Sequence, residues 1–378
     1  MNALKILSDL ISFKSITPNE ASAFAYISNI LSDFKRLDLN APGEKTKNVL
    51  FYKLSQNKNS EHLCFCTHID VVPPGEHWTH DPFVALQKDG AIYGRGAQDM
   101  KSGLACAISA LKNAKSDISV SLLITSDEEG DGTFGTKYAL DLINSKYKEL
   151  LPTSCIVTEP TCEAKMGDKI KIGRRGSING KITIFGKQGH VAYPRKCINP
   201  IELLGARLGI LSGNHLDSGM RINVDNQSFG FAPSKFVITN IHAGIGVNNV
   251  TPNKLEMLFN VRNNPSVSLE DVKNHIKNAL DPLDYELEIK QSAEAFLSSA
   301  KAPIVSALMR EIQNITNITP SLDTGGGTSD AKHLAKLSIP VVEFGVRNDT
   351  IHAINERVFI SDVKALEQIF TKLLENLC

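Results

Sequence analysis

The sequence of 378 residues predicts an α/β protein that carries a second, α+β domain inserted into it. Up to about residue 160, apolar strand-like runs alternate with helix-like segments, which is typical of a largely parallel sheet covered by helices. From residue 169, apolar and polar residues alternate instead, as in antiparallel strands with one exposed face. We therefore expect a domain with a mixed, largely parallel sheet from 1–174 and 292–378, and a two-layer α+β domain from 175–291.

Composition excludes several classes of partner. Lysine and arginine total 41, as do aspartate and glutamate, so the formal net charge is zero. The protein therefore has no net positive charge that would attract nucleic acid or an anionic membrane. No apolar run approaches the roughly 20 residues that span a bilayer, and the first residues lack the features of a signal peptide. The seven cysteines are scattered and form no Cys-x-x-Cys pair. We expect a cytoplasmic protein with no nucleic-acid or membrane partner.

The spacing of apolar residues predicts the elements of the first domain. The expected helices are 3–13, 20–34, 103–114, 133–144 and 303–316. The expected strands are 48–52, 64–72, 119–125, 154–158 and 339–345, with a hairpin-like segment at 89–96. This alternation is what indicates parallel strands joined by helices.

The inserted domain is predicted from alternating patterns separated by two helical ones. The expected strands are 170–177, 180–185, 235–242, 254–263 and 285–290, and the expected helices are 199–213 and 269–280. The order from 180 onward is β-α-β-β-α-β, which predicts a two-layer, ferredoxin-like α+β unit.

His68 and Asp70 stand at the polar end of the strand 64–72. Side chains two residues apart in a strand point to the same face. The carboxylate of Asp70 is therefore expected to bond one imidazole nitrogen of His68, which leaves the other nitrogen free for a metal. A purely structural hydrogen bond between the two residues is the alternative.

Four further groups with acidic or imidazole side chains follow predicted strands or lie in loops: Asp99, Glu128 with Glu129, Glu159, and His352. Because parallel strands end at the same edge of a sheet, these side chains are expected to meet. Imidazoles and carboxylates without thiolates suit zinc in a hydrolytic site, or a neighbouring metal such as cobalt. The alternatives are a helix N-cap for Asp99, a solvated turn for the glutamates, and a structural role for His352.

Other polar loops carry less information. His77 and His80, in the loop 72–83, are expected to be solvated rather than ligands. The pair Gly94-x-Gly96 lacks the third glycine of a phosphate loop, and the loop 323–330 lacks the Gly-Lys-Ser/Thr of a Walker loop. Neither loop therefore matches a phosphate-binding motif.

Together the polar groups resemble the motifs of the dinuclear zinc amidohydrolases, a family that includes acetylornithine deacetylase and glutamate-releasing carboxypeptidases. The resemblance lies in His68-x-Asp70, Gly94-Arg95-Gly96-Ala97-x-Asp99-Met100-Lys101, Ser126-Asp127-Glu128-Glu129-Gly130, Glu159-Pro160 and the late His352. It covers nearly the whole chain and implies a zinc-peptidase-like catalytic domain with a cis peptide after Asp99. Gln98 departs from the family pattern, in which a small residue is commoner, and we attach no function to it at this point.

The resemblance implies two Zn²⁺ ions per subunit, with Co²⁺ possible in one or both positions. In this family the aspartate that corresponds to Asp99 bridges the two ions. His68 and Glu159 would then complete one metal position. Glu129 and His352 would complete the other.

The resemblance also implies the catalytic roles. Asp70 would orient His68, and Glu128 would be the general base and then the general acid. His190 would donate a hydrogen bond to the developing oxyanion from the other subunit of a homodimer. The inserted domain would be the dimerisation domain.

Three stretches, 173–177, 188–194 and 326–330, resemble the branch of this family that releases succinate. The implied substrate is N-succinyl-L,L-diaminopimelate, in the biosynthesis of lysine and diaminopimelate. The residues expected to bind it are Arg174, Tyr193, Asn248, Asn249, Arg262, Gly327 and Thr328. The two arginines suit its carboxylates, with a strand-end salt bridge as the alternative for Arg262.

Two other functions are weighed against this one. The nearest is a related deacylase, such as an acetylornithine deacetylase, or a dipeptidase. The other is a non-catalytic protein on the same scaffold, which should have lost Glu128 or a metal ligand. None of these residues is missing from the sequence.

Overall fold

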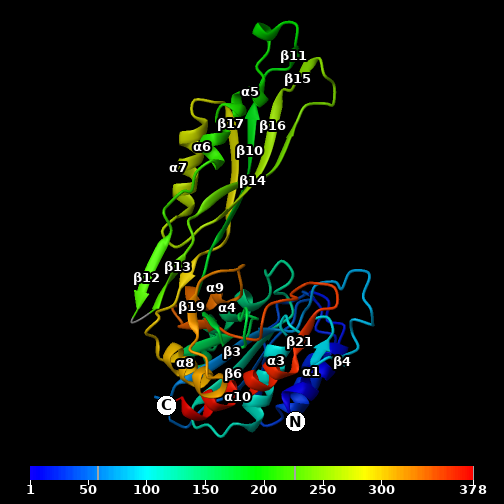
Figure 1. Cartoon of the computed structure of the whole chain (residues 1–378), viewed down its shortest axis with the longest axis vertical. Coiled ribbons are helices and arrows are strands. Elements are labelled where there is room, and N and C mark those ends of the chain that lie inside the picture. Colours follow the sequence, from blue (N-terminus) through cyan, green and yellow to red (C-terminus); the bar gives the residue numbers. More distant parts are fainter. Residues whose placement is uncertain (58, 225–226, 378) are drawn as a thin grey trace. The chain divides into compact units, whose positions relative to one another are not determined.

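The computed structural model describes residues 1–57, 59–224 and 227–377, and the chain forms two compact units (Figure 1). The first unit comprises 1–172, 298–323 and the chain from 329 onward, and the second comprises 173–297 and 324–328. Residues 324–328 belong to the second unit and not, as the sequence predicts, to the first. In the structure, Thr324 donates from Oγ1 to the carbonyl of Gly230, and Arg174 donates to the carbonyl of Gly325, so this segment packs with the second unit.

An eight-stranded mixed sheet forms the centre of the first unit, in the order β1-β2-β6-β3-β7-β20-β8-β19. The strands in that order are Lys35–Asp38, Asn48–Lys53, Ser119–Thr125, His62–His68, Ser154–Val157, Val341–Glu343, Lys169–Lys171 and Ser321–Asp323. The four central strands β6, β3, β7 and β20 are parallel to one another. Strand β3 is buried along its whole length, as its apolar sequence predicts. The predicted α/β class with a mixed, largely parallel sheet is confirmed.

Helices and a small second sheet complete the first unit. The helices are α1 Ala3–Ser12, α2 Ala23–Ile30, α3 Lys101–Asn113, α4 Thr136–Lys146, α8 Pro303–Thr316, α9 Ala331–Lys336 and α10 Ile360–Asn376, with the short 3₁₀ helix η1 Lys148–Leu150. The small sheet has the order β21-β5-β4, from Arg357–Phe359, Ala91–Tyr93 and Leu86–Lys88. Helix α3 packs against α1 and α10.

The start of α3 approaches the end of β7 very closely. A Cβ on Gly103 would lie only 2.3 Å from the backbone carbonyl of Thr158. Only a glycine therefore allows this contact. The contact holds the beginning of α3, directly after Asp99, beside the strand end that precedes Glu159.

The second unit is built on an antiparallel sheet in the order β14-β16-β10-β17, from Lys235–Ala243, Lys254–Arg262, Ser177–Phe185 and Tyr285–Ala293. The helices α5 Pro200–Gly205, α6 Leu208–Ser212 and α7 Leu269–Leu280 share its buried core with apolar residues of the sheet. The short elements are β9 Gly173–Arg174, β18 Phe296–Leu297, β11 Gly189–His190, β15 Val250–Thr251, β12 Met220–Val224, β13 Gln227–Phe231 and η2 Pro194–Lys196. The predicted β-α-β-β-α-β order is confirmed, but the helix expected over 199–213 is broken into α5 and α6.

Among the described residues, no helix is long and apolar enough to cross a membrane. The six cysteines that the structure describes are all free, and five of them are buried. Cys378 lies outside the described residues.

His62 predicts a pH dependence of folding. Burial in β3 lowers the pKa of its imidazole to about 4, and its Nε2 lies 2.9 Å from Ser121 Oγ. Below the ordinary pKa of about 6.5, the unfolded chain binds a proton that the folded chain does not, so stability falls as the pH falls from about 6.5 to 4, by up to about 3 kcal/mol.

The variant His62→Gln should show a shallower loss of stability over this pH range, measured by urea unfolding of metal-free protein. His77→Gln is the control because this side chain is 84% exposed. Identical pH profiles for wild type and His62→Gln would contradict the prediction.

Candidate metal centre

His68 ends β3 with one ring nitrogen held and the other free. Its Nδ1 lies 2.8 Å from the backbone carbonyl of Asp70, and a carbonyl only accepts, so Nδ1 carries the proton. The carboxylate of Asp70 is farther away, with Oδ1 at 3.6 Å. The expected hydrogen bond to the Asp70 carboxylate is thus replaced by one to the Asp70 backbone carbonyl, and Asp70 lies beyond the end of β3. Nε2 of His68 is left with a free lone pair.

The carboxylate of Asp70 instead holds the turn after β6. It accepts hydrogen bonds from the backbone N–H groups of Glu128 at 3.3 Å and Glu129 at 3.0 Å. Asp70 therefore connects the end of β3 to the turn that carries both glutamates. Burial raises its own pKa to about 6.

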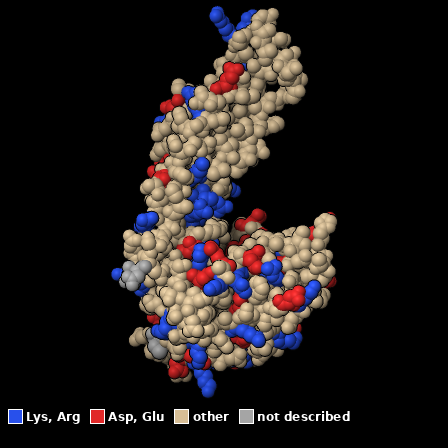
Figure 2. Space-filling model, viewed as in Figure 1, with Lys and Arg blue, Asp and Glu red and all other residues tan. Residues whose placement is uncertain are grey.

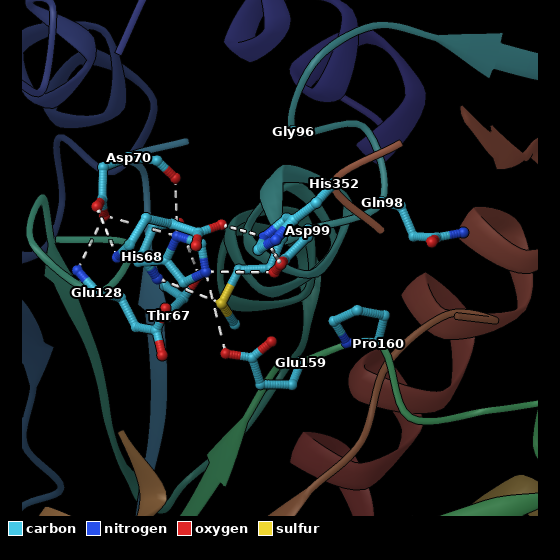
Figure 3. A network of polar contacts seen from close by, with 12 residues as sticks. Thr67, His68, Asp70, Gly96, Gln98, Asp99, Glu128, Glu159, Pro160 and His352 are labelled. Atoms are coloured by element: carbon cyan, nitrogen blue, oxygen red, sulfur yellow. Dashed lines mark hydrogen bonds and ion pairs between the residues drawn. The ribbon is translucent and has the colours of Figure 1, made fainter. Parts of the chain in front are cut away.

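Asp99 lies between two imidazoles (Figure 3). Its Oδ1 is 3.3 Å from Nε2 of His68, and its Oδ2 is 3.1 Å from Nε2 of His352. The peptide bond from Asp99 to Met100 is cis, as the resemblance implied. Each oxygen of one carboxylate thus faces a different histidine, which is the arrangement that a bridging ligand requires.

Each histidine also has a glutamate beside it. Glu159 Oε1 lies 3.9 Å from Nε2 of His68, and Glu129 Oε1 lies 2.8 Å from Nε2 of His352. Glu159 follows the end of β7 and Glu129 follows the end of β6. The structure therefore brings all five expected metal ligands together, in two groups that share Asp99.

Two atoms of this cluster lack the hydrogen bonds that buried polar atoms normally make. Nε2 of His68 and Oδ1 of Asp99 are buried, and neither has a hydrogen-bond partner within the described ranges. Buried polar atoms without partners are costly, unless a ligand satisfies them. The ligand atoms of His68, Asp99 and Glu129 lie within 4.8 Å of one another, and so do those of His68, Glu128 and Glu159. The donor set therefore fits divalent metal ions.

The pKa values of two glutamates in the cluster are raised, which is consistent with a site that binds cations. Burial raises the pKa of Glu128 to about 8, with neighbouring carboxylates adding to the shift against the opposing charge of His68. Burial also raises the pKa of Glu159 well above its ordinary value, and the charges of Asp99 and Glu128 add to it. Burial and like charges therefore disfavour the ionised form of these two glutamates.

A network around Glu356 supports Asp99, and the sequence analysis gave this residue no role. Glu356 is buried, pairs with Arg95 at 2.7 Å, and accepts backbone hydrogen bonds from Gly96, Gln98 and Asp99. It therefore fixes the loop that leads to Asp99. The partners are about 260 residues apart in the chain, so no local pattern indicates the contact.

The two loop histidines are not among the cluster. His77 is exposed, as expected. His80 is half-buried and packs edge-on against Trp78 and Tyr93, so the prediction of a solvated side chain is wrong for His80.

The other eight predicted site residues, namely Arg174, His190, Tyr193, Asn248, Asn249, Arg262, Gly327 and Thr328, all belong to the second unit. Within that unit they fall into two groups. One group lies near β11 and β15, and the other lies where β10 begins and β16 ends. These are opposite ends of the antiparallel sheet (Figure 1).

The first group surrounds His190. Strand β11 pairs with β15, the ring of Tyr193 lies 6.0 Å from that of His190, and Val191 donates to the carbonyl of Asn249. Nδ1 of His190 accepts a hydrogen bond from the N–H of Ala192 at 3.1 Å. A neutral His190 therefore carries its proton on Nε2, which is free to donate.

The second group contains the two arginines. Arg174 is buried in β9 and donates from Nη1 to the carbonyl of Gly325 at 2.8 Å. Arg262 is exposed at the end of β16, and no ion pair of Arg262 occurs within the described residues, so the salt-bridge alternative is not observed. Figure 2 shows basic side chains gathered at one end of the second unit.

The two groups are far apart. Strand β10 separates them and has 9 residues. At roughly 3.3 Å per residue, it is about 27 Å long. One copy of the second unit therefore does not bring His190 and Arg174 to the same small substrate.

Comparison with known proteins identifies the family. Residues 64–376 match the model of Peptidase family M20/M25/M40. The chain belongs to this family. It is therefore a hydrolase, as predicted, and the alternative of a non-catalytic scaffold protein is set aside.

Similar proteins cover the full length of the chain. Succinyl-diaminopimelate desuccinylase from Nautilia profundicola is 50% identical over 100% of both chains, and that from Sulfurimonas denitrificans is 46% identical, again over 100% of both. Among solved structures, an M20 family metallo-carboxypeptidase from Sulfolobus solfataricus superposes with a TM-score of 0.77 at 18% identity, covering 99% of each chain. At that identity the likeness concerns the fold alone.

The geometry predicts which histidine is essential for metal binding. His68→Ala should weaken the binding of Zn²⁺ or Co²⁺ by more than the roughly 10–100-fold that loss of an outer partner causes, because it removes a ligand itself. His77→Ala should bind metal like the wild type. Equilibrium dialysis measures both, with circular dichroism as a check of folding. Undiminished binding by His68→Ala would contradict the assignment.

Proposed function

We propose that this enzyme hydrolyses N-succinyl-L,L-diaminopimelate to succinate and L,L-diaminopimelate, in the biosynthesis of lysine and diaminopimelate. The observation that carries the proposal is the carboxylate of Asp99, whose two oxygens face His68 and His352 at 3.3 and 3.1 Å. This arrangement supports hydrolysis assisted by two metal ions. The identity of 46–50% to proteins named succinyl-diaminopimelate desuccinylase supports the choice of substrate.

The proposed metal positions use the two groups of ligands that share Asp99. His68 and Glu159 complete one position, and Glu129 and His352 complete the other. We propose Zn²⁺ in both, with Co²⁺ possible in one or both, because the donors are imidazoles and carboxylates. When bound, the ions supply the Lewis acidity that makes a water molecule nucleophilic near neutral pH.

Glu128 is the proposed proton carrier. Its backbone N–H is held by Asp70, so its carboxylate starts from a fixed turn at the edge of the metal cluster. Glu128 accepts the proton of the attacking water and then gives it to the departing amine. It is not needed as a ligand in either proposed position, which leaves it free for this role.

His190 is the proposed donor to the oxyanion. The N–H of Ala192 occupies Nδ1, so Nε2–H is the donor that remains. Because His190 and the arginines lie at opposite ends of one sheet, we propose that His190 acts in the site of a second copy. The enzyme is then a homodimer.

The edge of the second unit supports this homodimer. Strand β14 is at the edge of the four-stranded sheet and exposes Val237 and Ile241, each at 47%. An apolar edge strand of 9 residues favours pairing with another chain. We therefore propose dimerisation through the second unit.

Arginines provide the proposed recognition of the substrate. N-succinyl-L,L-diaminopimelate carries several carboxylates, and guanidinium groups bind carboxylates by paired hydrogen bonds. Arg174 and Arg262 are the proposed partners. The residues proposed to assist them are Tyr193, Asn248, Asn249, Gly327 and Thr328.

A cytoplasmic location remains part of the proposal. The free state of the six described cysteines supports a reducing compartment.

Substrate preference tests the proposed activity. With Zn²⁺ or Co²⁺ supplied, kcat/KM for N-succinyl-L,L-diaminopimelate should exceed that for N-acetyl-L-ornithine by on the order of 100-fold or more, because the smaller substrate has a single carboxylate and leaves at least one arginine without a partner. Release of free amine measures both reactions. A preference for acetylornithine, or for a dipeptide, would assign the enzyme to another branch of the family.

Mixing two inactive variants tests the roles of Glu128 and His190 together. Glu128→Gln and His190→Ala should each lose nearly all turnover while keeping their metal content. After unfolding and refolding as a mixture, half of the dimers should be mixed and carry one intact site each. The mixture should therefore regain about a quarter of wild-type activity. The control is each variant refolded alone, and no recovery in the mixture would refute the shared site.

A further inference from the structure

We propose that Gln98 is a positioning residue, which fastens the loop carrying Asp99 to the loop carrying His352. By doing so it sets the affinity of the metal position formed by Asp99, Glu129 and His352. The inference rests on the two metal positions of the proposed function and is independent of the substrate.

The ligands of the two metal positions differ in how firmly the fold holds them. His68 and Glu159 belong to one position, and His352 belongs to the other. His68 ends a fully buried strand and is 1% exposed, and Glu159 follows the buried strand β7. His352 instead lies in the loop between β20 and β21, is 47% exposed, and has a left-handed backbone with φ of 57°. This conformation costs a residue with a Cβ about 1–2 kcal/mol. The position of His352 therefore depends on contacts made by its loop.

Gln98 makes those contacts on both sides of His352. Its Nε2 donates to Oδ1 of Asp349 at 2.6 Å and to the carbonyl of Arg357 at 3.2 Å, and its Oε1 accepts from the N–H of Thr350 at 2.8 Å. The side chain is 1% exposed and points away from the carboxylate of Asp99 (Figure 3). One amide group thus joins the residue before Asp99 to both ends of the segment 349–357.

The rest of the network does not require this side chain. Glu356 binds the loop through the backbone N–H groups of Gly96, Gln98 and Asp99, which any residue at position 98 except proline retains. Arg95 pairs with Glu356 and donates weakly to the carbonyl of His352 at 3.4 Å. A small residue at position 98 would keep these bonds and lose only the link to 349–357.

Replacing Gln98 is expected to affect one of the two metal positions more than the other. Loss of an outer partner of a metal ligand typically lowers metal affinity by about 10–100-fold. Gln98 acts on the loop of His352, whereas His68 and Glu159 are fixed by the sheet. Replacing Gln98 should therefore weaken one of the two metal positions and leave the other nearly unchanged.

The test is a Co²⁺ titration of the metal-free full-length protein, followed by visible absorption and calorimetry. In Gln98→Ala, one of the two binding constants should fall by about 10–100-fold and the other should stay within about twofold. His352→Ala identifies the affected step, because it removes a ligand of the same position. Gln98→Glu should weaken this step further, since it places a second carboxylate against Asp349.

Gln87→Ala is the matched control, because Gln87 is an exposed glutamine of β4 in the same unit. It should keep both constants. The proposal is overturned if Gln98→Ala leaves both constants unchanged, if both fall equally in a protein with wild-type circular dichroism and melting temperature, or if the wild type binds one ion only. A wild type that binds two ions but does not cleave the succinylated substrate refutes the proposed function and leaves this inference in place.

Discussion

The crowding of carboxylates around one buried aspartate is the constraint on which this structure depends. Burial alone would raise the pKa of Asp99, but the adjacent imidazoles of His352 and His68 lower it, so the carboxylate stays ionised. Its neighbours Glu128 and Glu159 are shifted in the opposite direction. Nearby positive charge stabilises such a cluster in its ionised form. The fold therefore gathers a set of side chains that suits divalent cations.

The two units divide the chemistry between them. The first unit gathers its polar groups because the parallel strands β3, β6 and β7 end at one edge, which is a general property of such sheets. The second unit is an independent layer of sheet and helices, and it presents its polar residues at its two ends. The sheet of the first unit carries most of the proposed metal ligands at its strand ends, while the residues proposed for the substrate and the oxyanion belong to the second unit.

Much of this arrangement follows from the sequence, because strand patterns and the acids behind them are local signals. His68, Glu128 and Glu159 were expected at one edge, and the structure places them there. Other features are not local. The long helix α10 and the hairpin of β12 and β13 were not anticipated, and the expected helix 199–213 is broken near Arg207. The contact of Glu356 with the loop of Asp99, and the use of the Asp70 carbonyl, depend on tertiary packing.

The length of β10 has a further consequence for how such enzymes diverge. Because residues alternate between the two faces of a sheet, adding or removing two residues preserves which side chains are buried. Each such step moves His190 by about 6.6 Å relative to Arg174. The distance between the two groups can thus change while the same face of the sheet stays buried, and strand length becomes a dimension along which natural variants or designers can alter which molecules the assembly accepts.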